Sequence, residues 1–170
     1  MATGTKAVRT LLTPIGALVF GLFTALFVYL ATLVDRALSL PWPFSDAVGW
    51  FVAVPLMAVG GAAIAWSAFH FVRAKGTPVP FNPPPTLVES GPYRYVRNPM
   101  VSGVFLLLFG IGFAIRSLSL VVIFTPLYIL ANVWELKKIE EPELIRRLGE
   151  DYLAYRERTP MLFPRIRGRN

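Results

Sequence analysis

Long apolar runs separated by short polar stretches dominate the chain. The first two, residues 11–34 and 47–72, are each longer than the roughly 20 residues that a helix needs to cross a bilayer core. Two more, residues 99–115 and 118–136, are slightly short for a full span and lie very close together, which favours a tight helical hairpin. The pattern predicts an all-α, polytopic membrane protein with about four transmembrane helices.

The composition agrees with a membrane protein built as one domain. Of the 170 residues, 55% are hydrophobic and the mean hydropathy is +0.56, so the polar side chains are too few to cover a soluble globule. The first apolar run is longer than a signal-peptide core and no Ala-x-Ala-like cleavage site follows it, so we expect it in the mature protein. With no internal repeat to divide the chain, residues 1–170 are interpreted as a single membrane domain.

The basic residues are distributed unevenly between the two ends of the apolar runs. The loop at residues 73–98 holds four Lys and Arg and the tail at residues 137–170 holds nine, whereas the two opposite loops hold only Arg36 and Arg116. Because cytoplasmic loops are enriched in Lys and Arg, we expect both termini, the loop and the tail to be cytoplasmic. Membrane orientation thus explains the net charge of +7. We predict membrane lipids as surroundings, no nucleic-acid partner and no obligatory protein partner.

Prolines predict where the helices end on the cytoplasmic side. The loop at residues 73–98 is rich in proline, which lacks a backbone donor, so we expect an extended, ordered loop on the membrane face. Pro142 disfavours helical geometry at Glu141, so the fourth helix is expected to break there and a new amphipathic surface helix to begin at Pro142. Its apolar face comprises Leu144, Leu148, Tyr152 and Tyr155, and its polar face Arg146, Arg147, Glu150 and Asp151.

The segment at residues 91–100, GPYRYVRNPM, joins the polar loop to the third apolar run. Asn98 is a good N-cap residue and Pro99 a good first helical residue, so a helix is expected to begin here. Its free amides and positive dipole end would be flanked by Tyr93, Arg94 and Arg97. We expect this combination to bind a carboxylate or a phosphate at the membrane surface.

Two acidic residues, Glu140 and Glu141, follow the fourth apolar run on the same predicted side of the membrane. Arginines and free amides can bind a carboxylate, glutamates can bind an ammonium group or a ribose diol, and the aromatic tail can cover a base. S-adenosylmethionine requires this combination of groups. The chain has no cysteine, which excludes disulfides, thiolate metal sites and a cysteine nucleophile, and we predict no metal.

Five segments, in unbroken order over roughly the C-terminal 100 residues, resemble the isoprenylcysteine carboxyl methyltransferase and phospholipid methyltransferase family. They are AKGTP at 74–78, LVESGPYRYVRNPM at 87–100, EEPEL at 140–144, LGEDYLAY at 148–155 and TPMLFP at 159–164. The resemblance implies a membrane-embedded enzyme that binds S-adenosylmethionine from the cytoplasm, between the last helices and the tail. It also implies a lipophilic acceptor that enters sideways from the bilayer.

In that family an Arg-His-Pro-x-Tyr motif and a Glu-Glu pair line the cofactor pocket. The corresponding residues here are Arg97, Asn98, Pro99 and Val101, followed by Glu140 and Glu141. Asn98 replaces the histidine and can still form hydrogen bonds, whereas Val101 replaces the tyrosine and offers no polar contact. We therefore expect cofactor binding by Tyr93, Arg94, Arg97, Asn98, Pro99, Glu140 and Glu141, and catalytic roles for Arg97, Glu140 and Glu141.

The sequence does not decide which molecule accepts the methyl group. Methyl transfer from a sulfonium is an in-line displacement on an activated carbon, so positioning and desolvation can supply much of the rate. An amine or thiol acceptor would have to lose a proton, and Glu140 or Glu141 is the best available base, whereas a carboxylate acceptor would need no base. An isoprenylcysteine-type carboxylate, a phospholipid amine and a small thiol are all compatible with these residues.

Other interpretations of the same residues also remain open. Arg94 and Arg97 could be topology determinants or anchors for lipid phosphate, and the acidic run could be a solvated helix end. His70, near the end of the second span, is expected mainly to be an interfacial residue. Two other functions are alternatives: a membrane NADPH-dependent reductase, because sterol reductases resemble this family in their C-terminal part, and a non-catalytic membrane protein of the same fold.

Overall fold

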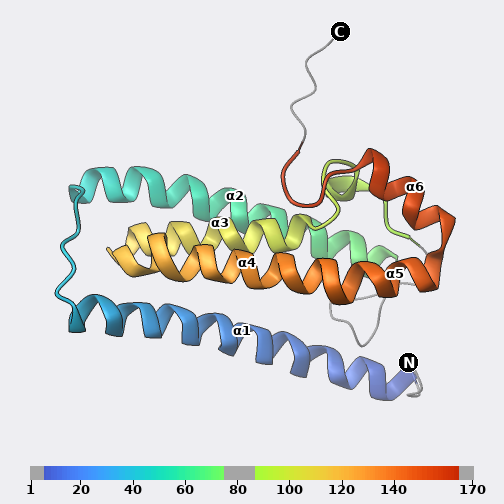
Figure 1. The fold of residues 1–170 in the computed structure, drawn as a ribbon, viewed down its shortest axis with the longest axis horizontal. Helices are drawn as coiled ribbons and strands as arrows, with labels where there is room; N and C mark the ends of the chain where they lie inside the picture. The colour runs from blue at the N-terminus through green and yellow to red at the C-terminus, as the bar shows by residue number, and fades with distance from the viewer. Residues whose placement is uncertain (1–5, 75–86, 165–170) are drawn as a thin grey trace, which may run out of the picture.

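The computed structural model describes residues 6–74 and 87–164, which are helical apart from short turns and connecting segments (Figure 1). Its main elements are α1 (Lys6–Ala37), α2 (Asp46–Arg73), α3 (Pro99–Ala114) and a long helix that extends from Leu120 to Leu148. The first, second and fourth of these contain stretches long and apolar enough to cross a membrane, and α3 is a shorter apolar helix. The expected all-α, polytopic integral membrane protein is confirmed.

Glycines bring α2 and α3 into close contact. A Cβ atom added to Gly60 of α2 would lie 2.6 Å from the carbonyl oxygen of Gly103 in α3, and one added to Gly103 would lie 2.7 Å from the oxygen of Gly60. Farther along the same interface, a Cβ on Gly110 would lie 2.6 Å from the side chain of Met57. The helix backbones therefore pack at a separation that admits no side chain at these positions, as small residues allow at helix interfaces.

The phenol of Tyr128, in the long helix, lies at the centre of the contact with α1. The side chain is only 1% exposed and is surrounded edge-on by the rings of Phe27, at 5.4 Å between centroids, and Phe105 of α3, at 6.2 Å. Its hydroxyl lies 3.3 Å from the Thr24 hydroxyl of α1, which itself donates to the carbonyl of Phe20. Aromatic packing with one satisfied polar group thus attaches α1 to the rest of the bundle.

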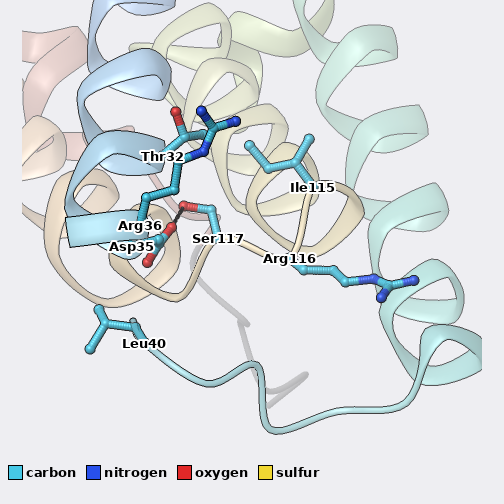
Figure 2. A pocket seen from close by; sticks show the side chains of 7 residues that line it. All are labelled: Thr32, Asp35, Arg36, Leu40, Ile115, Arg116 and Ser117. Carbon is cyan, nitrogen blue, oxygen red and sulfur yellow. Dashed lines mark hydrogen bonds between the residues drawn. The ribbon is translucent and has the colours of Figure 1, made fainter. Parts of the chain in front are cut away.

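The predicted helical hairpin is present at the end of α3. The chain reverses at Ile115 and Arg116, which has a left-handed φ of 57°, and helical structure resumes at Leu118. Asp35, in the last turn of α1, accepts a hydrogen bond from the Ser117 hydroxyl (Figure 2). It also accepts bonds from the backbone amide of Ser119, at 2.9 Å, and from the Ser119 hydroxyl. A carboxylate from α1 therefore caps the helix that follows the hairpin.

Replacing Asp35 with alanine should lower the free energy of unfolding by about 2 kcal/mol, because the Ser119 amide and two serine hydroxyls would lose their acceptor. Denaturant unfolding of the purified protein in detergent measures this change. Asp46→Ala is the control, since the Asp46 and Arg116 side chains are 66% and 53% exposed and such pairs contribute about 0–1 kcal/mol. Equal losses in the two variants would contradict a capping role for Asp35.

The long helix after the hairpin contains two π turns. It consists of η2 (Leu120–Phe124), α4 (Thr125–Glu135), η3 (Leu136–Glu140) and α5 (Glu141–Leu148), where η2 and η3 are the π segments. At the end of η3 the amide of Glu141 donates to the oxygen of Leu136, five residues back. A proline follows each π segment by two residues, at Pro126 and Pro142. The wider turn relieves the clash between a proline ring and the preceding turn, so the helix continues through both prolines.

The predicted helix break at Pro142 is therefore wrong. Glu141 has a φ of −60° and a ψ of −44°, which is ordinary helical geometry, even though it precedes a proline. The helix ends instead at Gly149, whose φ of 58° suits glycine, and α6 (Glu150–Arg158) begins directly after it. Two short helices, α5 and α6, thus replace the single amphipathic helix, although both tyrosines of α6 are buried as the predicted apolar face requires.

Candidate functional site

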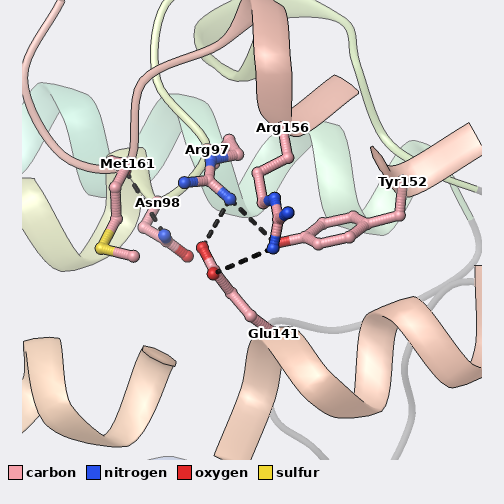
Figure 3. Close-up of polar contacts among 6 residues, drawn as sticks. All are labelled: Arg97, Asn98, Glu141, Tyr152, Arg156 and Met161. Atoms are coloured by element: carbon pink, nitrogen blue, oxygen red, sulfur yellow. Dashed lines mark hydrogen bonds and ion pairs between the residues drawn. The ribbon is translucent and has the colours of Figure 1, made fainter. Parts of the chain in front are cut away.

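Four segments meet at the end of the bundle opposite the hairpin turn. They are the short helix η1 (Gly91–Arg94) with the residues before α3, then α5, α6 and the segment at residues 159–162 (Figures 1 and 3). The sequence predicted that the 91–100 segment, the glutamates and the tail would gather on one side of the membrane. They lie at one end of the bundle and contact one another.

An ion pair between Arg97 and Glu141 is at the centre of this region. Arg97 Nη1 lies 2.5 Å from Glu141 Oε1, and the two side chains are only 10% and 13% exposed. The same Nη1 donates to the Tyr152 hydroxyl of α6 at 3.3 Å, and Arg156 Nη1 lies 4.0 Å from the other Glu141 oxygen (Figure 3). The structure thus joins two of the three residues expected to be catalytic, and it adds Tyr152 and Arg156.

The Nε donor of Arg97 is buried and unpartnered among the described residues. Nη1, by contrast, is occupied by Glu141 and Tyr152. A buried guanidinium donor without an acceptor is costly, because burial removes its bonds to water. The Nε–H group therefore offers a hydrogen bond to an anionic or carbonyl oxygen.

The backbone amides before α3 are occupied by the tail. Arg97 N donates to the oxygen of Pro160 at 2.8 Å, and Asn98 N donates to the oxygen of Met161 at 3.0 Å. The expected N-cap by Asn98 is wrong: its side chain makes no cap bond, and its Nδ2 lies 3.4 Å from the Met161 oxygen instead. These two amides are therefore unavailable to a bound anion, and the side chain of Arg97 remains as the donor.

Ser102, which the sequence did not single out, completes the attachment of the tail. Its hydroxyl lies 2.7 Å from the oxygen of Leu162 and 3.0 Å from the oxygen of Asn98. The signal in the sequence was the TPMLFP segment at 159–164, which gave no indication of what it contacts. We refer to residues 159–162, tied to the start of α3 by these bonds, as the tail strap.

Ser102→Ala should loosen the tail strap, because one hydrogen bond to a buried segment contributes about 1 kcal/mol. Limited proteolysis with trypsin should then cleave after Arg158 about fivefold faster than in the unsubstituted protein. Ser90→Ala serves as the control, since Ser90 is exposed and its side chain makes no cap bond. An unchanged cleavage rate in Ser102→Ala would show that the backbone bonds alone hold the strap.

Tyr93 is enclosed by α2 and α6 and does not face open space. It is 5% exposed, its ring packs edge-on against Phe71 at 5.2 Å, and its carbonyl accepts a hydrogen bond of 2.7 Å from the Tyr155 hydroxyl. Burial raises the pKa of Tyr93, and the neighbouring Tyr155 and Glu140 raise it further. Burial likewise raises the pKa of Tyr155, so its hydroxyl stays protonated and donates.

The remaining predicted residues have different surroundings. Pro99 is buried and is the first residue of α3, as predicted. Arg94 is exposed and forms no ion pair within the described part of the chain. Glu140 is also exposed and forms no ion pair with Arg97, although it lies close enough to Tyr93 to influence its pKa. Cofactor roles for Tyr93, Arg94, Asn98 and Glu140 therefore stay predictions.

Comparisons with known proteins place the chain in a family. No solved structure is significantly similar to the chain. Among curated proteins it is similar to a methanethiol S-methyltransferase of Crocosphaera subtropica, with 28% identity over 140 residues, covering 74% of this chain and 51% of that protein. The chain thus spans about half the length of the curated relative it matches. The profile of the phospholipid methyltransferase family matches residues 48–151, more than half of the sequence, and the chain therefore belongs to that family.

Proposed function

We propose that this protein is an S-adenosylmethionine-dependent methyltransferase that methylates a lipophilic acceptor at the end of the bundle where Arg97 meets Glu141. The observation that carries the proposal is the buried Nε–H of Arg97, which has no partner among the described residues. It lies in a region that the family profile includes. A donor of this kind, held in place by an ion pair, is suited to a carboxylate ligand.

The residues at this site fit the polar groups of S-adenosylmethionine. Arg97 supplies a cationic donor for its carboxylate, and the exposed Glu140 carboxylate supplies an acceptor for an ammonium group or ribose hydroxyls. When bound, S-adenosylmethionine supplies an electrophilic methyl group on a sulfonium. The ion pair fixes the guanidinium orientation before any ligand arrives, which is the preorganisation that methyl transfer needs.

Proton removal, where the acceptor needs it, is assigned to Glu140 rather than Glu141. The Glu141 carboxylate is 13% exposed and already pairs with Arg97 and Arg156, so protonating it would weaken both interactions. Glu140 is exposed and forms no ion pair within the described residues, so it is free to accept a proton. The family name mentions a phospholipid and the relative's name a thiol. A phospholipid amine and a thiol would both use such a base.

The first test is cofactor binding. Isothermal calorimetry of the purified protein should show saturable binding of S-adenosylmethionine, whereas NADPH should neither bind nor raise the melting temperature. Preferential binding of NADPH would instead indicate a reductase. Failure to bind either molecule would favour a non-catalytic membrane protein.

The second test identifies the acceptor. Membranes containing the protein are incubated with methyl-labelled S-adenosylmethionine, with and without added methanethiol, and label is measured in extracted lipid and in the volatile fraction. Label in lipid indicates a phospholipid or prenylated acceptor, and label in the volatile fraction indicates a small thiol. Glu140→Gln should lower the rate with an amine or thiol acceptor by 10²-fold or more, while leaving calorimetric binding within about tenfold.

A further inference from the structure

A polar pocket lies at the opposite end of the bundle from the Arg97–Glu141 pair. It occupies about 300 Å³ between the last turn of α1 and the hairpin turn after α3 (Figure 2). The residues that line it are Thr32, Asp35, Arg36, Leu40, Ile115, Arg116 and Ser117. Because the candidate methyltransferase site lies at the other membrane surface, this pocket has no part in the proposed reaction.

The acidic group of the pocket is already occupied. Asp35 accepts three hydrogen bonds from Ser117 and Ser119, which fix the wall between α1 and the hairpin turn. Its carboxylate therefore acts as a helix cap and forms no ion pair with Arg36 among the described residues. These bonds join the wall of the pocket to the hairpin turn and satisfy the hydrogen-bonding capacity of the carboxylate oxygens within the fold.

The two arginines of the pocket differ in what they contact. Arg116 points away from the pocket, and its Nη2 lies 2.5 Å from Asp46 at the start of α2 (Figure 2). Arg36 extends along α1 toward Thr32, opposite Ile115, and forms no ion pair in the part of the chain that the structure describes. The Arg36 guanidinium is thus available to an anion, and this exposed side chain lines the pocket.

The other lining groups indicate what kind of anion would fit. The Thr32 hydroxyl donates to the Tyr29 oxygen at 2.7 Å, so its remaining lone pair can accept a hydrogen bond from a hydroxyl of the ligand. Leu40 and Ile115 provide apolar walls beside these polar groups. The pocket lies at the C-terminal end of the apolar stretch Pro14–Ala37, where phospholipid head groups are expected.

We propose that this pocket binds the head group of an anionic phospholipid, with Arg36 contacting the phosphate. The charges at this surface balance: the described loops and helix ends here carry two acidic residues, Asp35 and Asp46, and two basic residues, Arg36 and Arg116. A general attraction of anionic lipid to a basic surface is therefore absent at this end. Retention of such a lipid would depend on the local geometry around Arg36.

The test compares Arg36→Gln with Arg116→Gln, which removes the same charge from the same surface but from an arginine that Asp46 already pairs. Each full-length protein is reconstituted in nanodiscs with equal amounts of phosphatidylglycerol and phosphatidylcholine. Lipid retained after transfer to detergent is quantified by native mass spectrometry. The unsubstituted protein and Arg116→Gln should retain phosphatidylglycerol preferentially, and Arg36→Gln should lower that preference about fivefold, as expected for one arginine near the membrane surface.

Two further experiments test which groups of the lipid the pocket recognises. Inorganic phosphate at millimolar concentration should not displace the lipid if the apolar walls contribute to binding, and displacement would identify a site for free phosphate. Thr32→Val, which replaces the hydroxyl with a methyl group of similar size, should lower retention of phosphatidylglycerol with little effect on phosphatidylcholine. Equal retention of the two lipids by the unsubstituted protein, or equal losses in Arg36→Gln and Arg116→Gln, would overturn the proposal.

Discussion

Replacing Arg97 with alanine is expected to abolish S-adenosylmethionine binding and to lower the free energy of unfolding by about 3–5 kcal/mol. The loss of stability follows because Glu141, 13% exposed, would keep a buried charge without its partner at 2.5 Å. Glu141→Ala should destabilise the protein by a similar amount, since it leaves the guanidinium buried without an anionic partner. Calorimetric binding and denaturant unfolding in detergent measure the two effects separately.

A double variant distinguishes a role in binding from a role in folding. Arg97→Met combined with Glu141→Met replaces the pair by apolar side chains of similar length, and such replacements of buried pairs are often neutral or stabilising. We expect this variant to recover most of the lost stability while S-adenosylmethionine binding stays undetectable. If the refolded double variant bound the cofactor normally, Arg97 would be a structural residue only and the proposed function would lose its main support.

Adjacent glycines of α2 should respond to alanine with opposite signs. Gly60→Ala is expected to destabilise the protein by about 1–3 kcal/mol, because the added Cβ would meet the backbone of Gly103 at 2.6 Å and neither helix can yield locally. Gly61→Ala should instead stabilise it by up to about 1 kcal/mol, because nothing lies within 4 Å and alanine favours a helix more than glycine does.

The comparison is made by unfolding both variants under identical detergent conditions. Because the two positions share a helix, a depth and a substitution, their difference isolates the contact with α3. Similar effects of the two substitutions would mean that α2 and α3 are not packed through Gly60. If α2 and α3 pack through Gly60, Gly110→Ala should cost less than Gly60→Ala, because the nearest neighbour of Gly110 is the flexible side chain of Met57. If they do not, the larger loss of stability should appear in Gly110→Ala.

The spans could be predicted from the sequence because they depend on local properties. The length of the apolar runs predicted α2 and α3, and the proline at position 99 predicted where α3 begins. The close spacing of the last two runs predicted the hairpin. The meeting of the 91–100 segment with Glu141 and the tail was likewise expected from charge and from the family resemblance. In each case the signal lies within a short window or in a motif.

The errors concern choices that only tertiary contacts decide. Asn98 has the chemistry of an N-cap, but the carbonyl of Met161, 63 residues away, competes successfully for its side chain. Pro142 is an ordinary helix breaker unless a π turn precedes it, and no local pattern announces such a turn. The cap of the hairpin comes from Asp35 on another helix, so the sequence around Ser117 could not reveal it.

The π turn before Pro142 also has a consequence for the adjacent glutamates. A π turn absorbs one extra residue, so every side chain beyond it points where the preceding residue would point in an uninterrupted α-helix. Straightening residues 136–140 would therefore rotate Glu141 away from Arg97 and bring Glu140 into its place. With two consecutive glutamates, we expect a carboxylate to face Arg97 in either register of the helix, and the other glutamate to be left toward solvent.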